Sequence, residues 1–202
     1  MTAVQLDFDY QKATQAINYF TRKESSHNGN KLKIIKLIWL ADRFHLRKYG
    51  RPVIGDEYVA MELGPVGSGV KDIIEQSNFA AKEEISYAKK YIKPVNKNVV
   101  QSLEKVDYDV FSKTDIESLE FAYDNFGSLD AISLSKITHK YPEWKKFEAI
   151  LKSGQSTRES MDYSDFFEDP KNLDNDKFEA DKKLLLESKE SFIETAKLQN
   201  SF

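Results

Sequence analysis

The sequence predicts a mainly α-helical fold with a small antiparallel β element, an α+β arrangement. Two observations lead to this prediction. Apolar residues recur at helical spacing in most segments before residue 155, and one β-branched and aromatic run, residues 53–61, is too short for a helix. The composition changes after residue 154. We therefore predict a compact helical domain over residues 1–154 and an acidic C-terminal extension, residues 155–202, with one helix.

The first predicted helix spans residues 9–23 and is amphipathic, because its apolar side chains share one face: Ala13, Ala16, Ile17 and Phe20. The polar residues 25–30 predict a loop, and Asn30 suits the N-cap of the next helix. That helix, residues 32–46, carries apolar side chains on nearly every side, including Trp39. A helix of this kind is surrounded by protein, so we expect it at the centre of the domain.

Glycine and proline mark the end of this central helix. Gly50 can take the left-handed conformation that closes a helix, and Pro52 prevents its continuation. The run of residues 53–61 then predicts a strand or an extended segment, because β-branched and aromatic residues dominate it.

A second turn follows, formed by consecutive residues: Gly64, Pro65 and Val66. The next helix is expected to begin near Ser68, because the glycines on either side of it disfavour an earlier start. Residues 82–106 mix Lys and Glu with apolar residues and contain a proline. They predict a β-hairpin, or a strand followed by a loop.

Further helices are predicted in the remaining third of the chain. Residues 112–127 begin with a capping-box pattern and end at a glycine. A short helix is expected over residues 129–138, and another opens at Pro142 with Trp144 facing inward. In the extension, apolar residues recur every seventh position over residues 176–198, which predicts the final helix.

Three motifs stand in a set order along the chain. They are KLIWLAD and YGRP in residues 36–52, YVAM and GPV in residues 58–66, and LSKITH with a later proline and tryptophan in residues 134–144. Their order and spacing resemble the Panacea domain, the SocA-like antitoxin domain of bacterial and phage toxin–antitoxin pairs. The resemblance frames residues 10–150. It implies a scaffold that neutralises a toxin by direct contact, or, as in the related SocA, an adaptor that delivers its toxin to a protease.

The motif residues are expected to maintain the fold, because they occupy turns or packing positions: Trp39, Gly50, Pro52, Gly64, Pro65, Val66, His139 and Trp144. Changing them should reduce solubility before it alters specificity.

Composition and charge restrict the class of protein. The chain has 202 residues, a formal net charge of −3 and no cysteine, which excludes disulfides and thiol chemistry. No apolar run is long enough to span a membrane, and the acidic start lacks the order of a secretion signal, so we expect a cytoplasmic protein. Residues 31–51 hold seven bases and one acid, whereas residues 155–202 hold twelve acids and seven bases.

No set of side chains predicts catalysis, so we expect a protein that is not an enzyme and uses no cofactor or metal. The histidines lack a metal-ligand spacing: His27, His45 and His139. The glycine run at residues 64–69 lacks the lysine of a phosphate loop and the context of a serine nucleophile. The neighbouring acids Asp56 and Glu57 point to opposite sides of an extended chain, which does not suit a shared proton.

Recognition of another protein is the remaining hypothesis, and the resemblance to the Panacea domain implies a cognate toxin encoded nearby as the partner. Solvent-facing side chains should make the contact, and five are candidates: Arg47, Arg51, Tyr163, Phe166 and Phe167. Aromatic rings supply contact area, and the carboxylates around them attract a basic partner. The alternative is that Phe166 and Phe167 pack against the protein's own body.

Two other binding hypotheses stay open. An adaptor would use the extension to present a toxin or another substrate to an ATP-dependent protease. A nucleic-acid-binding regulator would use the bases of residues 31–51, although the central helix cannot both fill the core and enter a groove along its length. The sequence makes no prediction of the oligomeric state.

Overall fold

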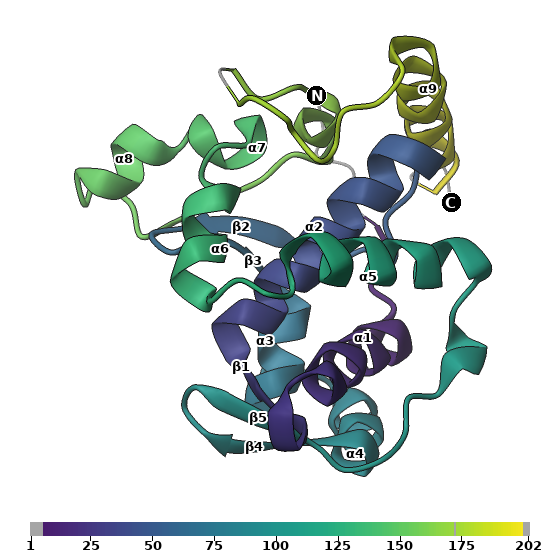
Figure 1. Ribbon diagram of the computed structural model, residues 1–202, viewed down its shortest axis with the longest axis vertical. Coiled ribbons are helices and arrows are strands. Elements are labelled where there is room, and N and C mark those ends of the chain that lie inside the picture. The colour runs from purple at the N-terminus through teal and green to yellow at the C-terminus, as the bar shows by residue number, and fades with distance from the viewer. Residues whose placement is uncertain (1–5, 172, 200–202) are drawn as a thin grey trace.

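The central element is α2 (Lys31–Tyr49), which runs through the middle of the molecule (Figure 1). The computed structural model describes residues 6–171 and 173–199. Helices from both halves of the chain pack around α2: α1 (Tyr10–Lys23), α3 (Ser68–Glu75), α5 (Lys113–Phe126), α6 (Ala131–Thr138) and α9 (Lys182–Gln199). With two small antiparallel sheets beside them, these helices confirm the predicted α+β class.

Helix α2 begins and ends as the sequence predicts. The Asn30 side chain accepts a hydrogen bond from the backbone N–H of Lys33 at 3.1 Å, which caps the first turn. At the other end, Gly50 is left-handed with φ 69°, and its N–H donates to the carbonyl of Leu46 at 2.9 Å. Trp39 is fully buried. The central helix is therefore surrounded by protein on all sides.

The caps of α1 and α5 also match the prediction. Asp9 accepts a hydrogen bond from the backbone N–H of Lys12 at 3.0 Å, and the expected apolar stripe of α1 is buried. At α5, Ser112 and Asp115 form the capping box: each side chain accepts a hydrogen bond from the other residue's backbone N–H. Four orphan N–H groups at each helix start need such partners, so the caps set where these helices begin.

Two three-stranded sheets flank the helical core. One has the order β1 (Asn28–Asn30), β5 (Val99–Ser102) and β4 (Ile92–Asn96). The other has the order β3 (Gly64–Gly67), β2 (Tyr58–Met61) and β6 (Arg158–Ser160). All pairings are antiparallel, and a bulge between Pro94 and Asn96 accommodates the proline. The extension thus adds β6 as an edge strand to a sheet of the domain.

Residues 53–61, expected to form a strand or an extended segment, combine the two. Only Tyr58–Met61 pairs as β2, because the backbone N–H groups of Val53 and Ile54 donate to the buried carboxylate of Asp42 instead of to another strand. A polar side chain on the central helix therefore holds the first part of this run in an extended loop.

The prediction for residues 82–106 is wrong in its first half. Residues Lys82–Tyr91 form helix α4, and the hairpin of β4 and β5 follows it. The Glu84 carboxylate accepts a hydrogen bond from the N–H of Ala81 at 2.8 Å, which stabilises the helix start. Only Ala88 of this helix is buried. A short, mostly exposed helix has a weak apolar stripe, so its sequence pattern could not be distinguished from that of a strand.

Shorter helical turns complete the described chain. The helix that opens at Pro142 is divided into α7 (Pro142–Lys145) and α8 (Glu148–Lys152). Trp144 lies inward, and its indole N–H donates to the carbonyl of Met61 at 2.9 Å. Three 3₁₀ turns occupy Ser25–His27, Tyr108–Val110 and Tyr163–Phe167. Among the residues that the structure describes, no helix combines the length and apolarity needed to cross a membrane.

Gly64→Ala is expected to reduce the free energy of unfolding by about 2–4 kcal/mol, as the sum of backbone strain and overpacking. Gly64 has φ +97°, and a Cβ there would lie 2.6 Å from Oγ1 of Thr138 and 3.0 Å from Nζ of Lys36. Gly154→Ala is the matched control, because Gly154 also has positive φ but a Cβ there would meet nothing within 4 Å. Urea unfolding of both variants checks this, and equal losses would contradict a role for the close contacts.

Candidate partner-binding cleft

The aromatic residues nominated in the extension lie in the core. Exposed fractions are 7% for Tyr163, 0% for Phe166 and 4% for Phe167, so the expectation that they face solvent is wrong. The Phe166 ring packs against Trp39, with the ring centroids 5.8 Å apart. The alternative, that these rings pack against the protein's own body, is what the structure shows. Acidic neighbours gave the segment a surface-like composition, but the 3₁₀ turn directs the rings inward.

Arg47 is also buried, with an exposed fraction of 2%. Its guanidinium donates to backbone carbonyls of the extension, at 3.1 Å to Phe166 and 3.2 Å to Phe178, and pairs with Asp169 at 2.5 Å. Arg47 therefore joins α2 to the extension, and the expectation that it faces solvent is wrong as well. Sequence spacing could not reveal this, because the partners are carbonyls more than 100 residues away.

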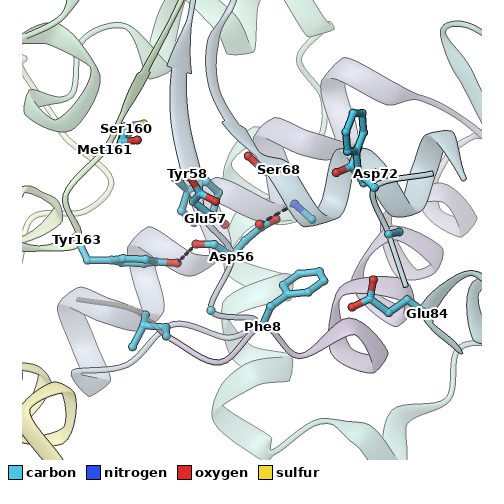
Figure 2. Close-up of a pocket in the computed structure, with 15 residues that line it drawn as sticks. Phe8, Asp56, Glu57, Tyr58, Ser68, Asp72, Glu84, Ser160, Met161 and Tyr163 are labelled. Atoms are coloured by element: carbon cyan, nitrogen blue, oxygen red, sulfur yellow. Dashed lines mark hydrogen bonds between the residues drawn. The ribbon is translucent and has the colours of Figure 1, made fainter. Parts of the chain in front are cut away.

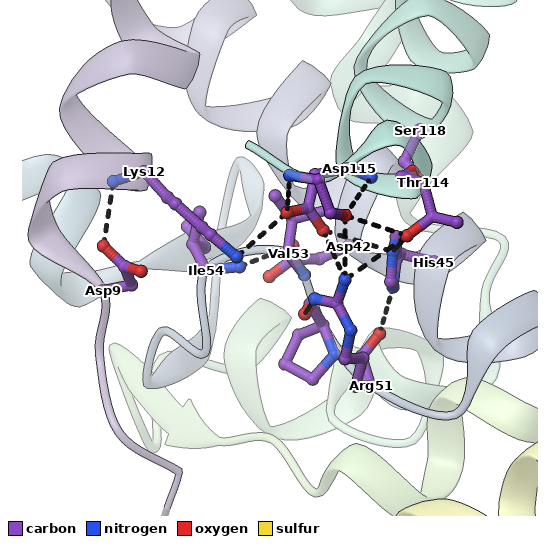
Figure 3. A network of polar contacts seen from close by, with 12 residues as sticks. Asp9, Lys12, Asp42, His45, Arg51, Val53, Ile54, Thr114, Asp115 and Ser118 are labelled. Atoms are coloured by element: carbon purple, nitrogen blue, oxygen red, sulfur yellow. Dashed lines mark hydrogen bonds and ion pairs between the residues drawn. The ribbon is translucent and has the colours of Figure 1, made fainter. Parts of the chain in front are cut away.

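Arg51 belongs to a polar network around Asp115 (Figure 3). The Asp115 carboxylate is buried and pairs with Nη2 of Arg51 at 2.8 Å and with Nζ of Lys12 at 2.9 Å. His45 contacts the same carboxylate at 3.3 Å, and burial lowers the pKa of this histidine to about 4. The Arg51 side chain is 42% exposed. It is the nominated residue that retains a substantial exposed surface, and its contact with a partner stays a prediction.

Two buried aspartates organise the chain between α2 and α3. Asp42 accepts hydrogen bonds from the Val53 N–H at 2.8 Å and from the Tyr58 hydroxyl at 2.9 Å. Asp56 accepts from the backbone N–H groups at the start of α3. Burial raises the pKa of both carboxyls to about 7. Each is therefore a structural acceptor that folding shifts toward its protonated form.

Asp42→Asn is expected to change how stability depends on pH. Burial raises the pKa of Asp42 from 3.8 to about 7, so between these values the folded state holds a proton that the unfolded state has released. The resulting stabilisation is complete below about pH 4 and is lost as the pH rises to about 7. Asparagine keeps one acceptor oxygen for the Val53 and Ile54 N–H groups and presents a donor in place of the other oxygen, as the protonated carboxyl does, but it does not titrate. Relative to the parent protein, the variant should gain about 2–4 kcal/mol between pH 4 and 7.

Urea unfolding of both proteins at several pH values measures this difference. The comparison is needed because the histidines act in the opposite direction. Burial lowers the pKa of His45 and of His139 from 6.5 to about 4, so their contribution grows as the pH rises through that interval. A stability difference between variant and parent that stays constant from pH 4 to 7 would contradict the assignment to Asp42.

An open cleft lies beside these aspartates (Figure 2). Its volume is about 570 Å³, and five segments line it: the N-terminal stretch with Leu6 and Phe8, residues 55–58, the start of α3, the 79–84 segment and residues 160–163. Sequence reasoning did not find this site. Its residues come from five separate stretches, and Phe79 showed no pattern that distinguishes it from a loop residue.

The floor of the cleft is held by Asp56. Its carboxylate accepts from the N–H groups of Gly69 and Val70, each at 2.8 Å, and its backbone carbonyl accepts from the Tyr163 hydroxyl at 2.6 Å (Figure 2). Gly69 lies against the Phe8 ring so closely that a Cβ there would be 2.6 Å from Cζ of the ring. Close packing and paired polar groups therefore give the cleft a well-defined floor.

The walls and rim are acidic and aromatic. Four acidic side chains line the cleft: Asp56, Glu57, Asp72 and Glu84. No Lys or Arg is among the described residues that line it. Phe79 stands on the rim with 91% of its surface exposed. Low-dielectric walls that carry one sign of charge concentrate the electrostatic field, so the cleft attracts cationic groups.

A second groove of about 590 Å³ is more apolar and is lined by Ile35 of α2, by Leu63 in the turn between β2 and β3, and by residues 151–157. The lysines on its rim already have partners. Lys31 and Lys71 both pair with Glu75, and Lys152 pairs with Glu148. Internal pairing reduces the charge that this groove offers to a partner.

The motif residues of the sequence occupy turns and packed positions. His139 stacks on Trp144, with ring centroids 3.7 Å apart and planes within 8°, and its Nε2 is buried without a hydrogen-bond partner. In β3, the carbonyl of Pro65 accepts from Nζ of the buried Lys36 at 2.6 Å. Nothing in the described part of the chain brings three or more His, Asp or Glu side chains together in a way that could hold a metal ion.

The chain belongs to the SocA-like antitoxin family: the family model described as "Antitoxin SocA-like, Panacea domain" matches residues 34–145. This match confirms the resemblance carried by the three motifs, and it covers the chain from α2 to α7. No curated protein and no solved structure matches the chain significantly.

Proposed function

We propose that this protein is a non-enzymatic antitoxin that acts in the cytoplasm and neutralises a toxin encoded beside it by direct protein–protein binding. The observation that carries the proposal is the family match over residues 34–145. An antitoxin of this kind needs a stable scaffold and a surface complementary to its toxin, and it needs no reacting groups.

The use of the buried polar groups supports binding over catalysis. Asp42 and Asp56 are occupied by backbone N–H groups, and Asp115 by two cations and a histidine. These groups hold the fold together, and even Asp56, which lines the acidic cleft, has its carboxylate occupied by two backbone N–H groups. The acidic cleft and the apolar groove are both open to solvent in the described part of the chain, so a partner could reach either of them.

One observation favours a second candidate, an adaptor for an ATP-dependent protease. Helix α9 packs on α2 through one face, yet it leaves large apolar side chains in solvent: Leu184 at 39%, Leu186 at 56% and Ile193 at 37% exposed. Leu186 and Ile193 are seven residues apart and so share one side of α9, and exposed apolar side chains of this kind suit contact with a further protein. Nucleic-acid binding has less support, because Arg43, Lys48 and Arg51 of the basic segment already pair with internal carboxylates.

Co-expression with the neighbouring reading frame tests the proposal. This chain should restore growth when that toxin is induced, and the two should purify as a complex of fixed mass ratio. If this chain binds the toxin but neutralises it only in hosts with intact ATP-dependent proteases, the adaptor function is established. Leu186→Gln should then abolish neutralisation. Failure to bind or neutralise any product of the adjacent frames would refute the antitoxin assignment.

A further inference from the structure

The charge of the cleft in Figure 2 is not balanced within the protein. None of its outer carboxylates, at Glu57, Asp72 and Glu84, forms an ion pair with a Lys or Arg of the described chain, whereas Glu75 of the same helix as Asp72 pairs with two lysines. The Asp72 side chain accepts from the Ser77 hydroxyl, and Glu84 caps α4. These neutral contacts fix the carboxylates in place and leave their charge available.

The carboxylates are spread along the cleft and do not converge. They come from separate elements, with Glu57 just before β2, Asp72 in the middle of α3 and Glu84 in the first turn of α4. The described residues contain no group of three or more acidic or histidine side chains that could hold a metal ion, so these carboxylates do not form a metal site. Separated charges of one sign match a ligand with several cationic groups along its length, such as an extended basic peptide.

Apolar surface lies between the charges. Phe79 is 91% exposed, and Leu6 and Phe8 form part of the lining. A fully exposed phenylalanine is costly in water, and at the rim of a cleft it can be covered by the aliphatic stem of a lysine or the plane of an arginine. The combination of an exposed ring with surrounding carboxylates therefore favours Lys and Arg over other side chains.

We propose that this cleft binds a Lys- and Arg-rich segment of the toxin, with Glu57, Asp72 and Glu84 contacting its cationic groups and Phe79 covering an adjacent stem. The inference rests on the proposed antitoxin function and identifies the surface and the partner chemistry. A toxin that acts on nucleic acid must present Lys and Arg to phosphates. When the cleft binds that segment of the toxin, it competes directly with the nucleic-acid substrate.

The test compares two triple variants in the full chain. Glu57→Gln, Asp72→Asn and Glu84→Gln together remove three charges from the cleft and keep the hydrogen-bond acceptors. Glu179→Gln, Glu190→Gln and Glu194→Gln remove three charges from exposed positions in the extension and give the same net charge. Isothermal titration against a catalytically inactive toxin measures affinity, and circular dichroism confirms that each variant is folded.

The cleft variant should bind about 10- to 100-fold more weakly at low salt, and the control variant within about 3-fold of the parent. The deficit should shrink as salt is added. Phe79→Ala should weaken binding about 10-fold without lowering the thermal midpoint, because its ring has almost no contacts to lose. Hydrogen exchange of the complex should protect a Lys- and Arg-rich stretch of the toxin.

Three results would overturn the proposal while leaving the antitoxin function intact. The first is equal affinity of the cleft variant and the parent for the toxin, and the second is protection of an acidic or neutral toxin segment. The third is self-association of the parent that only the cleft variant abolishes, because a second copy would then be the occupant of the cleft. If the parent itself does not bind the toxin, the proposed function fails instead, and the two failures are thereby distinguished.

Discussion

A chain ending at residue 154 is expected to be unfolded. The extension contributes buried rings to the same core as α2, with exposed fractions of 0% for Phe166, 3% for Phe178 and 2% for Phe192. Each buried phenylalanine contributes about 1.5–3 kcal/mol, and a domain of this kind is stable by only about 5–15 kcal/mol. Removing these rings, β6 and the partners of Arg47 together should exceed that margin. Circular dichroism and gel filtration of the truncated chain measure the loss.

Two variants of the full chain calibrate this result. Phe166→Ala alone should reduce the free energy of unfolding by about 3–5 kcal/mol, because the cavity next to Trp39 cannot collapse completely. Leu186→Gln, at an exposed position of α9, should change it by less than about 0.5 kcal/mol. A soluble 1–154 fragment that unfolds cooperatively would show instead that the extension only covers a domain that is complete without it.

The proposed boundary at residue 154 illustrates what composition can and cannot predict. The change from an apolar-rich body to an acidic segment is real, and the family match ends before it, at residue 145. Composition does not, however, record that Phe166 and Phe178 lie against the central helix. Burial is decided by contacts between residues far apart in sequence, which a local average does not contain.

Elements whose ends are determined locally were predicted well. The caps Asn30 and Gly50 set the limits of α2, and the Ser112 capping box sets the start of α5, because each acts on backbone groups within a few residues. Helix α4 was missed for the complementary reason. Its apolar stripe is short, and the residues that hold it, such as Gln15 bonded to Tyr87, lie in another element.

The acidic cleft was beyond prediction from the sequence. Asp56 and Glu57 were noted only as an acidic pair, and Phe79 was not singled out, because the feature arises when α3, α4 and the N-terminal stretch meet. The expectation that Arg47 faces solvent was wrong for a related reason. A guanidinium on a basic stretch has the same local pattern whether it faces water or, like Arg47, ends among buried carbonyls.

Arg43→Met is expected to reduce the free energy of unfolding by about 3–5 kcal/mol, the cost of leaving a buried charge without its partner. Arg43 and Glu143 form an ion pair in which both side chains are fully buried. The guanidinium also donates to the carbonyl of Glu168 at 3.0 Å and lies 4.3 Å from the centroid of the Tyr141 ring. Burial raises the pKa of Glu143, so the lone carboxyl should take up a proton, and the loss should be smaller at pH 5 than at pH 8.

The double variant Arg43→Met, Glu143→Leu separates a lost partner from a lost ion pair. Nε of Arg43 and Oε2 of Glu143 have no hydrogen-bond partner, so the pair is incompletely satisfied even in the parent protein. Replacing both side chains with apolar groups removes two desolvated charges and these unpaired atoms together. The double variant should therefore recover most of the stability that the single variant loses, as measured by urea unfolding. The contrary result is a loss of unfolding free energy in the double variant that equals the sum of the losses in Arg43→Met and in Glu143→Leu. In that case the two side chains act independently, and the cost lies in packing against Tyr141.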